Sequence, residues 1–390
     1  MSRVVSFVVF LTVALGLVGL VHYYAWARLI RDVSLPTATH RALTAGMVVL
    51  FLLVPAWIWF SRLGDWARPL VWLSFIWTGV LVLLLLTLAL TDAGRGLLTL
   101  LSRLQGDAGP LDPERRTLLA RVSAACVVLL TGGLSAYAVR SGLARVAVRE
   151  VQVRLARLPR PLDGTTIAQL SDVHVGPTIR RDFIEQIVAT TNALEPDVIA
   201  ITGDLVDGSV EELRAHVAPL SQLKARYGVF FVTGNHEYYS GAREWCAELE
   251  RMGIRVLRNE RVSIGDGDHS YDLCGIDDTT AGEFLDDHGP DLEKALAGRD
   301  PSRELVLLAH QPRALFEAVE RGVGLQLSGH THGGQIWPWN FMVRLQQPIV
   351  SGLEKIKETF VYVSNGTGYW GPPMRLAAPA EITLLRLSSS

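Results

Sequence analysis

The stretch Val198-Ile199-Ala200-Ile201-Thr202-Gly203-Asp204-Leu205-Val206-Asp207 joins an apolar, β-branched run to a glycine and two carboxylates. A short run of this composition is typical of a buried strand, and glycine and aspartate are typical of the loop that follows one. Four other parts of the sequence repeat the pattern. They are Ser171-Asp172-Val173-His174, Gly234-Asn235-His236-Glu237, Ala309-His310-Gln311 and Gly329-His330-Thr331-His332-Gly333.

Short apolar runs alternate with amphipathic segments from about residue 147 onward. We expect strands at 166–170, 198–202, 229–233, 305–309 and 325–327, and helices at 181–194, 210–225, 242–252 and 312–321. This alternation predicts a layered α/β domain. Ligands bind such sheets beyond the carboxyl ends of the strands, which is where all five clusters fall. The later runs 360–364 and 381–387 are expected to complete a second sheet.

The polar side chains of these clusters are carboxylates, amides and imidazoles. This mixture suits Mn, Fe, Zn or Co better than calcium. With about seven ligands, two ions that share a bridging carboxylate are more natural than one ion. A pair of ions can activate a bridging water and hold the oxygens of a phosphoryl group during attack. Because two divalent ions outweigh the charges of Asp172 and Asp204, such a site stays positive, as an anionic substrate requires.

These motifs resemble the calcineurin-like metallophosphoesterase family over about residues 166–387. The family's series Asp-x-His, Gly-Asp-x-x-Asp, Gly-Asn-His-Glu, His and Gly-His-Thr-His is complete in this chain. The resemblance implies a four-layer α/β/β/α sandwich and a metal-dependent phosphoester hydrolase. Together with the segment Pro372-Pro373-Met374-Arg375-Leu376, it is greatest with the membrane-associated branch, which includes UDP-diacylglucosamine hydrolases.

The resemblance also assigns roles to individual residues. One ion would be held by Asp172, His174 and His332, the other by Asn235, His310 and His330, and Asp204 would bridge them. His236 would stabilise developing charge or protonate the leaving oxygen. Asp207 would orient a ligand, although a turn-stabilising aspartate also fits this position. From the sequence we expect Arg375 to be solvated, with a grip on a substrate phosphate as the alternative.

Four stretches without Asp, Glu, Lys or Arg precede this domain, at 4–24, 42–60, 69–91 and 122–139. A helix of roughly 20 apolar residues crosses a bilayer, and tryptophans and tyrosines near the ends of these stretches suit its interface. We therefore expect an all-α transmembrane bundle of four helices in residues 1–140. A juxtamembrane linker with the first strand would follow in 141–165, and the metallophosphoesterase domain in 166–390.

The absence of charge within these stretches favours an anchor over an ion-coupled pump. The first stretch could instead be a cleaved signal peptide, because Ala25-Trp26-Ala27 mimics a cleavage site. Arginines continuing through Arg154, Arg157 and Arg160 favour a cytoplasmic catalytic domain.

Charge and cysteine content exclude other classes of protein. The net charge of −2 provides no general attraction for nucleic acid. The phosphoesterase half lacks a basic stripe with interleaved aromatics, so we expect no nucleic-acid partner. The three cysteines show no paired spacing, which argues against a disulfide framework and against a cysteine zinc site.

The leading hypothesis is a multi-pass protein of the cell membrane with a dinuclear metal centre. It would hydrolyse a phosphodiester, pyrophosphate or phosphomonoester, on a lipid head group or another phosphorylated substrate, by attack of a metal-activated hydroxide. Membrane lipids are then its expected partners. Two alternatives remain: a phosphodiesterase for soluble nucleotides tethered by the bundle, and a metal-binding membrane receptor without turnover.

Overall fold

The computed structural model describes residues 3–105, 112–267 and 269–390. Over these ranges the chain divides into two compact units. One comprises Met1–Arg140 with Gly371–Met374, and the other comprises Ser141–Trp370 with Arg375–Ser390.

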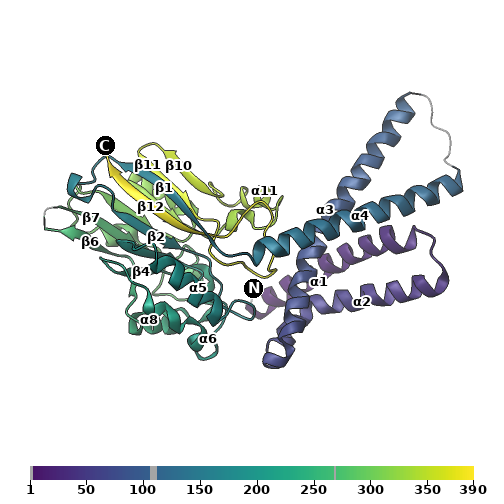
Figure 1. Ribbon diagram of the computed structural model, residues 1–390, viewed down its shortest axis with the longest axis horizontal. Helices are drawn as coiled ribbons and strands as arrows, with labels where there is room; N and C mark the ends of the chain where they lie inside the picture. The colour runs from purple at the N-terminus through teal and green to yellow at the C-terminus, as the bar shows by residue number, and fades with distance from the viewer. Residues whose placement is uncertain (1–2, 106–111, 268) are drawn as a thin grey trace. The chain divides into compact units, whose positions relative to one another are not determined.

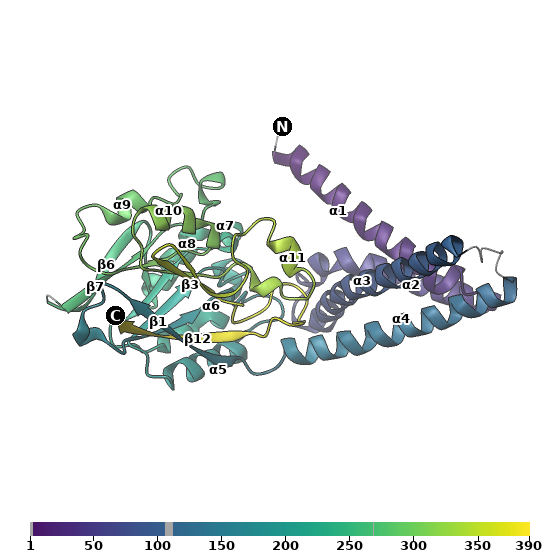
Figure 2. The same ribbon diagram turned by 90° about the horizontal axis from the view of Figure 1, so that it is seen from above.

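The first unit is helical (Figures 1 and 2). Its elements are α1 (Arg3–Trp26), the π-helical turn η1 (Ala27–Arg31), α2 (Thr37–Phe60), the 3-10 turn η2 (Asp65–Ala67), α3 (Arg68–Leu104) and α4 (Pro113–Gly142). Four segments of the described chain are long and apolar enough to cross a membrane. They are Leu11–Arg31, Thr37–Phe60, Asp65–Leu104 and Pro113–Gly142.

Apolar side chains cover the outside of this unit as well as its interior. Leu20 and Val49 are each 63% exposed and Leu129 is 75% exposed. Inside, Leu88 and Val127 are buried in one cluster. Helices that are apolar on all sides are characteristic of membrane spans.

Two of the helices are longer than the charge-free stretches that predicted them. α3 runs past residue 91 to Leu104, and α4 begins at Pro113. Leucine and arginine are both good helix formers, so the helix continues where the apolar run stops. As a result Asp92 and Arg95 lie on α3, and charges do occur within the helical unit.

The second unit contains a sheet in the order β1-β12-β2-β3-β4-β5. Its strands are β1 (Ala147–Leu155), β2 (Thr166–Leu170), β3 (Val198–Thr202), β4 (Val229–Val232), β5 (Arg255–Val256) and β12 (Glu381–Ser389). The helices that accompany it are α5 (Arg181–Asn192), α6 (Val210–Val217), α7 (Asn235–Ser240) and α8 (Ala242–Arg251).

Another sheet of this unit has the order β10-β11-β9-β8-β7-β6. Its strands are β6 (Glu260–Asp266), β7 (His269–Gly275), β8 (Leu305–Leu308), β9 (Leu325–Ser328), β10 (Gly352–Ile356) and β11 (Thr359–Val363). The helices on this part of the chain are α9 (Leu292–Leu296), α10 (Leu315–Glu320) and α11 (Asn340–Val343). Short 3-10 turns include η6 (Pro312–Ala314) and η7 (His332–Gly334).

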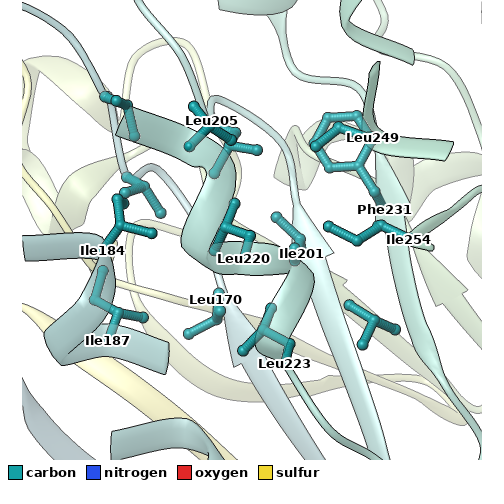
Figure 3. Close-up of a cluster of buried hydrophobic side chains, with 14 of the residues drawn as sticks. Leu170, Ile184, Ile187, Ile201, Leu205, Leu220, Leu223, Phe231, Leu249 and Ile254 are labelled. Atoms are coloured by element: carbon teal, nitrogen blue, oxygen red, sulfur yellow. The ribbon is translucent and has the colours of Figure 1, made fainter. Parts of the chain in front are cut away.

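Side chains of alternate residues build the layers, because successive residues of a strand point to opposite faces. In β3, Val198 and Ala200 join a core shared with Leu327 of the other sheet. Ile199 and Ile201 join a core with the helices α5, α6 and α8 (Figure 3).

On the outer face of the other sheet, Leu305 and Leu307 pack in a cluster with Leu292 of α9 and Ala318 of α10. Helices therefore cover the outer face of each sheet, and the predicted four-layer α/β/β/α order is confirmed.

The prediction that the run 381–387 belongs to the second sheet is wrong. The run 381–387 forms β12, which lies between β1 and β2 in the first sheet. It runs parallel to β1, with Ala147 opposite Glu381, and antiparallel to β2. Pairing between strands so far apart in sequence leaves no local signal in composition.

Candidate metal centre

The predicted ligands lie together at the carboxyl ends of five strands. Asp172 and His174 follow β2, Asp204 follows β3, and Asn235 follows β4. From the other sheet, His310 follows β8, and His330 and His332 follow β9. Because β2, β3 and β4 are parallel, as are β8 and β9, these loops meet at one edge of the sandwich.

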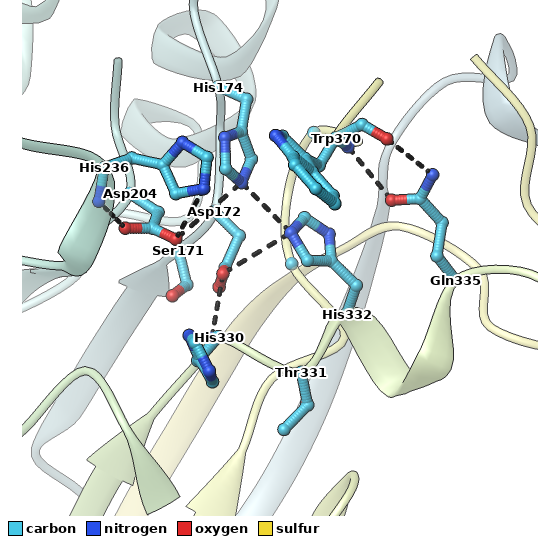
Figure 4. A network of polar contacts seen from close by, with 12 residues as sticks. Ser171, Asp172, His174, Asp204, His236, His330, Thr331, His332, Gln335 and Trp370 are labelled. Atoms are coloured by element: carbon cyan, nitrogen blue, oxygen red, sulfur yellow. Dashed lines mark hydrogen bonds and ion pairs between the residues drawn. The ribbon is translucent and has the colours of Figure 1, made fainter. Parts of the chain in front are cut away.

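One group of ligand atoms comes from Asp172, His174 and His332. All three residues are buried, and their ligand atoms lie within 4.8 Å of one another. The Nε2 atoms of His174 and His332 face each other at 3.0 Å, and His332 Nε2 is 3.6 Å from Asp172 Oδ1 (Figure 4).

A second group comes from Asp204, His310 and His330, with Asn235 beside them. His310 Nε2 lies 3.1 Å from Asp204 Oδ2. His330 Nδ1 lies 3.0 Å from the side-chain oxygen of Asn235 and 3.3 Å from His310 Nε2.

Asp204 lies between the two groups. Its Oδ2 is 3.1 Å from His310 Nε2 and 4.0 Å from His174 Nε2. Its other oxygen accepts a hydrogen bond from the backbone N–H of His236 at 2.9 Å. This is the position required of the predicted bridging carboxylate.

The donor set fits divalent cations. Asp172 Oδ2 is buried and has no hydrogen-bond partner among the described residues. His310 Nδ1 lies 2.7 Å from the carbonyl oxygen of Thr202, and His174 Nδ1 lies 3.1 Å from Asp207 Oδ1. When each Nδ1 donates to its oxygen and a bound metal displaces the proton of Nε2, Nε2 is a lone-pair donor that faces the centre.

Burial and neighbouring charges shift the pKa values of the predicted ligands in different directions. Burial alone would raise the pKa of Asp204, but His310 and His236 hold it well below its usual range. Burial and the neighbouring His310 lower the pKa of His330 to about 3. Burial and His174 also lower the pKa of His332 far below its usual value. His330 and His332 are therefore neutral near pH 7, the form in which imidazole binds a metal.

The backbone of the ligand loops is strained. Asp172, His174, Asp204, His330 and His332 all have positive φ, between 50° and 71°. Non-glycine residues rarely adopt this conformation, and it concentrates at functional sites. Glycine is required beside two of these residues. A Cβ on Gly234 would meet the Asp204 carboxylate, and one on Gly329 would meet Ser171 and Asp172.

His236 and Asp207 lie beside the ligands as a hydrogen-bonded pair. His236 Nδ1 is 2.6 Å from Asp207 Oδ1, and the same oxygen faces His174 Nδ1. Burial opposes protonation of His236, but Asp204 and Asp207 outweigh it and raise its pKa to about 9. The His236 side chain is 15% exposed and its Nε2 lies 3.9 Å from Asp204 Oδ2, so the protonated ring has the position of a proton donor beside the centre.

Glu237 is a functional position that the sequence analysis missed. It is fully buried. Its carboxylate accepts backbone N–H groups from Gly234 at 2.6 Å, Asp204 at 3.0 Å and Leu205 at 2.7 Å. It thereby ties the loop after β3 to the loop after β4. A glutamate three residues after the N-cap Gly234 fits the capping-box spacing, and this signal could have identified it.

Trp370 is a second missed residue. The centre of its ring lies 5.7 Å from the centre of the His236 ring, and the centre of the Tyr239 ring lies 5.1 Å from it. The Gln335 side chain fixes the Trp370 backbone by donating to its carbonyl at 3.0 Å and accepting its N–H at 2.9 Å (Figure 4). No sequence motif near Trp370 indicated this position.

Both expectations for Arg375 are wrong. Its guanidinium is fully buried and is occupied by backbone carbonyls. It donates to Gly368 at 3.0 Å, Ala378 at 2.8 Å and His332 at 3.4 Å, and its Nη2 lies 3.4 Å from His332 Nδ1. Burial lowers its pKa to about 10, so it stays charged near neutral pH. Through its contacts with the carbonyl oxygen and Nδ1 of His332, Arg375 positions this predicted ligand.

Replacing Arg375 by Lys should weaken both the fold and the metal centre. The single ammonium group of lysine cannot donate to all of these carbonyl oxygens as the planar guanidinium does. We expect the free energy of unfolding to fall by about 1–3 kcal/mol, and metal affinity to fall about 10- to 100-fold. Denaturant unfolding and metal titration of the full chain measure the two effects. Arg181→Lys is the matched control, since that side chain is 53% exposed. Unchanged metal affinity in Arg375→Lys would contradict the supporting role.

The chain is similar to known metallophosphoesterases. The family described as "Calcineurin-like phosphoesterase" matches residues 165–334. A transmembrane protein with metallophosphoesterase domain from Danio rerio is 39% identical over 328 residues, which are 82% of this chain and 74% of that protein. An uncharacterized metallophosphoesterase of Campylobacter jejuni is 31% identical over 387 residues, 98% of each chain.

The Bos taurus transmembrane protein with metallophosphoesterase domain is 44% identical over 293 residues, or 72% of this chain. The match spans 65% of the bovine protein's own length.

Proposed function

The chain belongs to the calcineurin-like phosphoesterase family of metal-dependent hydrolases, and from that membership we propose that it cleaves a phosphoester or pyrophosphate of a membrane lipid. The observation that carries the proposal is an exposed apolar segment directly after the ligand His332. Its exposed members are Trp337, Trp339, Phe341, Met342 and Leu345.

This segment has the chemistry of a surface that meets lipid. Trp339 is 57% exposed and Leu345 is 76% exposed. Tryptophan and other large apolar side chains in this setting enter the boundary between head groups and acyl chains. A phosphate at the metal centre would thus have its acyl chains close to a surface suited to them. The apolar helices of the other unit, and relatives named transmembrane proteins, support membrane association.

The residues of the centre divide the chemical work. Two divalent ions, which we propose to be Mn, Fe, Zn or Co, would supply Lewis acidity that activates water and neutralises phosphoryl oxygens. Asp172, His174 and His332 would hold one ion, Asn235, His310 and His330 the other, and Asp204 both. His236 would donate its proton to the leaving oxygen. Asp207 would orient His236 and His174 through the oxygen that they share.

The proposal extends to the location of the protein and to its partners. We propose a multi-pass membrane protein with its catalytic unit on the cytoplasmic side, and membrane lipids rather than nucleic acid as its partners.

A second candidate is hydrolysis of soluble nucleotides. It is favoured by the rings of Trp370 and Tyr239 beside His236, because aromatic side chains stack on nucleobases.

Metal removal gives the first test. Full chain treated with a chelator should lose hydrolysis of bis(p-nitrophenyl) phosphate, and added Mn²⁺ should restore it. Activity that survives chelation would contradict the metal-dependent mechanism.

The lipid substrate is tested by comparing substrates on the same full chain in nanodiscs. Phe341→Ser combined with Leu345→Ser should lower the rate on phospholipid and lipid pyrophosphate while sparing bis(p-nitrophenyl) phosphate. Phe316→Ser is the control, since Phe316 is 66% exposed but lies on α10. Turnover of cyclic nucleotides with no turnover of any lipid would favour the second candidate.

A further inference from the structure

The helical unit contains a polar cavity of about 430 Å³ among the residues of η1, α3 and α4. Charged side chains dominate its lining. They are Arg28, Arg31, Arg95, Arg116, Asp32 and Asp92. This volume lies within the range of ordinary small-molecule sites.

Positive charge exceeds negative charge in this cavity, since four arginines face two aspartates. Both carboxylates already have partners. Asp92 accepts from Tyr24 Oη at 2.6 Å and Arg28 Nε at 2.8 Å. Asp32 accepts from Arg28 at 3.1 Å and from Arg31 at 3.0 Å.

The guanidinium N–H groups of the other two arginines remain available to a ligand. Within residues 3–105, 112–267 and 269–390, the side chains of Arg95 and Arg116 make no hydrogen bond or ion pair. A guanidinium presents a fork of N–H donors that matches two oxygens of a phosphate. Arg95 is partly buried and Arg116 is exposed, so both guanidinium groups are available to an anion that enters the cavity.

An apolar groove of about 280 Å³ lies between α1 and α2. Its lining includes Gly19, Tyr23, Trp26, Met47 and Phe51. Arg31 connects the groove to the charged cavity. It lines the cavity, donates to Tyr23 Oη at 3.3 Å, and places its guanidinium carbon 5.7 Å from the centre of the Trp26 ring.

We propose that the helical unit is a binding site for an anionic phospholipid, with the phosphate in the arginine cavity and an acyl chain in the groove. The proposal rests on the bundle lying in a membrane and is independent of the catalytic substrate. Basic pockets between membrane helices bind anionic head groups by charge, and the adjoining groove adds the selection for an acyl chain.

The test uses the full chain, delipidated in mild detergent. Native mass spectrometry and thermal unfolding are recorded with phosphatidylglycerol and with phosphatidylcholine of the same acyl chains. We expect retained adducts and a raised Tm with phosphatidylglycerol and no comparable effect with phosphatidylcholine. Equal effects of the two lipids would overturn the proposal.

Paired variants assign the site. Arg95→Gln with Arg116→Gln should weaken phosphatidylglycerol binding by about 10- to 30-fold. Arg41→Gln with Arg103→Gln removes the same charge from exposed positions outside the cavity and should leave binding unchanged. If both pairs weaken binding equally, attraction is general and no site exists. Because binding is the readout, the result does not depend on whether the chain hydrolyses any lipid.

A third arm separates a lipid from a soluble anion. Gly19→Leu fills the groove, where a Cβ at Gly19 would meet only Phe51 Cε2 at 3.6 Å. We expect this variant to lose phosphatidylglycerol adducts while inorganic phosphate still raises its Tm slightly. If inorganic phosphate stabilises the parent chain as much as phosphatidylglycerol does, and Gly19→Leu changes neither effect, the site takes a soluble anion and the lipid assignment is wrong.

Discussion

Replacing Asp204 by Asn is expected to abolish hydrolysis, with kcat/KM falling by on the order of 10³-fold or more. Asp204 Oδ2 lies between His310 Nε2 at 3.1 Å and His174 Nε2 at 4.0 Å, so its charge serves both groups of ligands. An amide keeps the shape of the side chain but carries no negative charge to hold two cations. Initial rates on bis(p-nitrophenyl) phosphate and the metal content per chain measure the effect.

Two observations would identify the cause of this loss. Asp286→Asn changes the same charge at an exposed position and should keep full activity and metal content. Asp204→Asn should bind less than the parent's complement of metal and should not recover with excess Mn²⁺. An Asp204→Asn variant that retains both the metal and the rate would exclude Asp204 as the bridging ligand.

Replacing His236 by Ala is expected to lower kcat by about 10²- to 10⁴-fold while metal binding persists. His236 donates protons in our proposal and contacts no predicted ion. The carboxylates of Asp204 and Asp207 outweigh the effect of burial and raise its pKa to about 9. Loss of an acid matters most when the leaving group is a poor one. The fall should therefore be larger for an alkyl phosphodiester than for bis(p-nitrophenyl) phosphate.

The comparison of leaving groups distinguishes acid catalysis from a general disturbance of the centre. His269→Ala, at an exposed position on β7, is the control and should match the parent. Equal losses on both substrates, or loss of metal from His236→Ala, would show that His236 acts by supporting the ligands.

The strand positions could be predicted closely because the strands are short, buried runs. β2 and β3 have the predicted bounds, and β8 ends one residue before the prediction. The end of each run also located the ligand loops, since parallel strands bring their carboxyl ends to one edge. The gathering of Asp172, Asp204, His310 and His332 is therefore a consequence of patterns that are local in sequence.

Other features depend on contacts between distant segments. The membership of β12 in the first sheet follows from its pairing with β1, and composition does not encode this partner. The burial of Arg375 depends on carbonyls of Gly368 and Ala378 that only the folded loops bring around it.

The position of β12 bears on when the catalytic unit can form during synthesis. β12 lies between β1 and β2, so the first sheet has a gap until the ribosome has passed Ser389. The apolar helices emerge much earlier and can enter a bilayer while the sheet is incomplete. Until β12 arrives, β1 and β2 present unpaired edges, which are the features that lead nascent sheets to aggregate. We therefore expect nascent chains stalled before Glu381 to depend on chaperones and to be sensitive to protease, and released chains to be resistant.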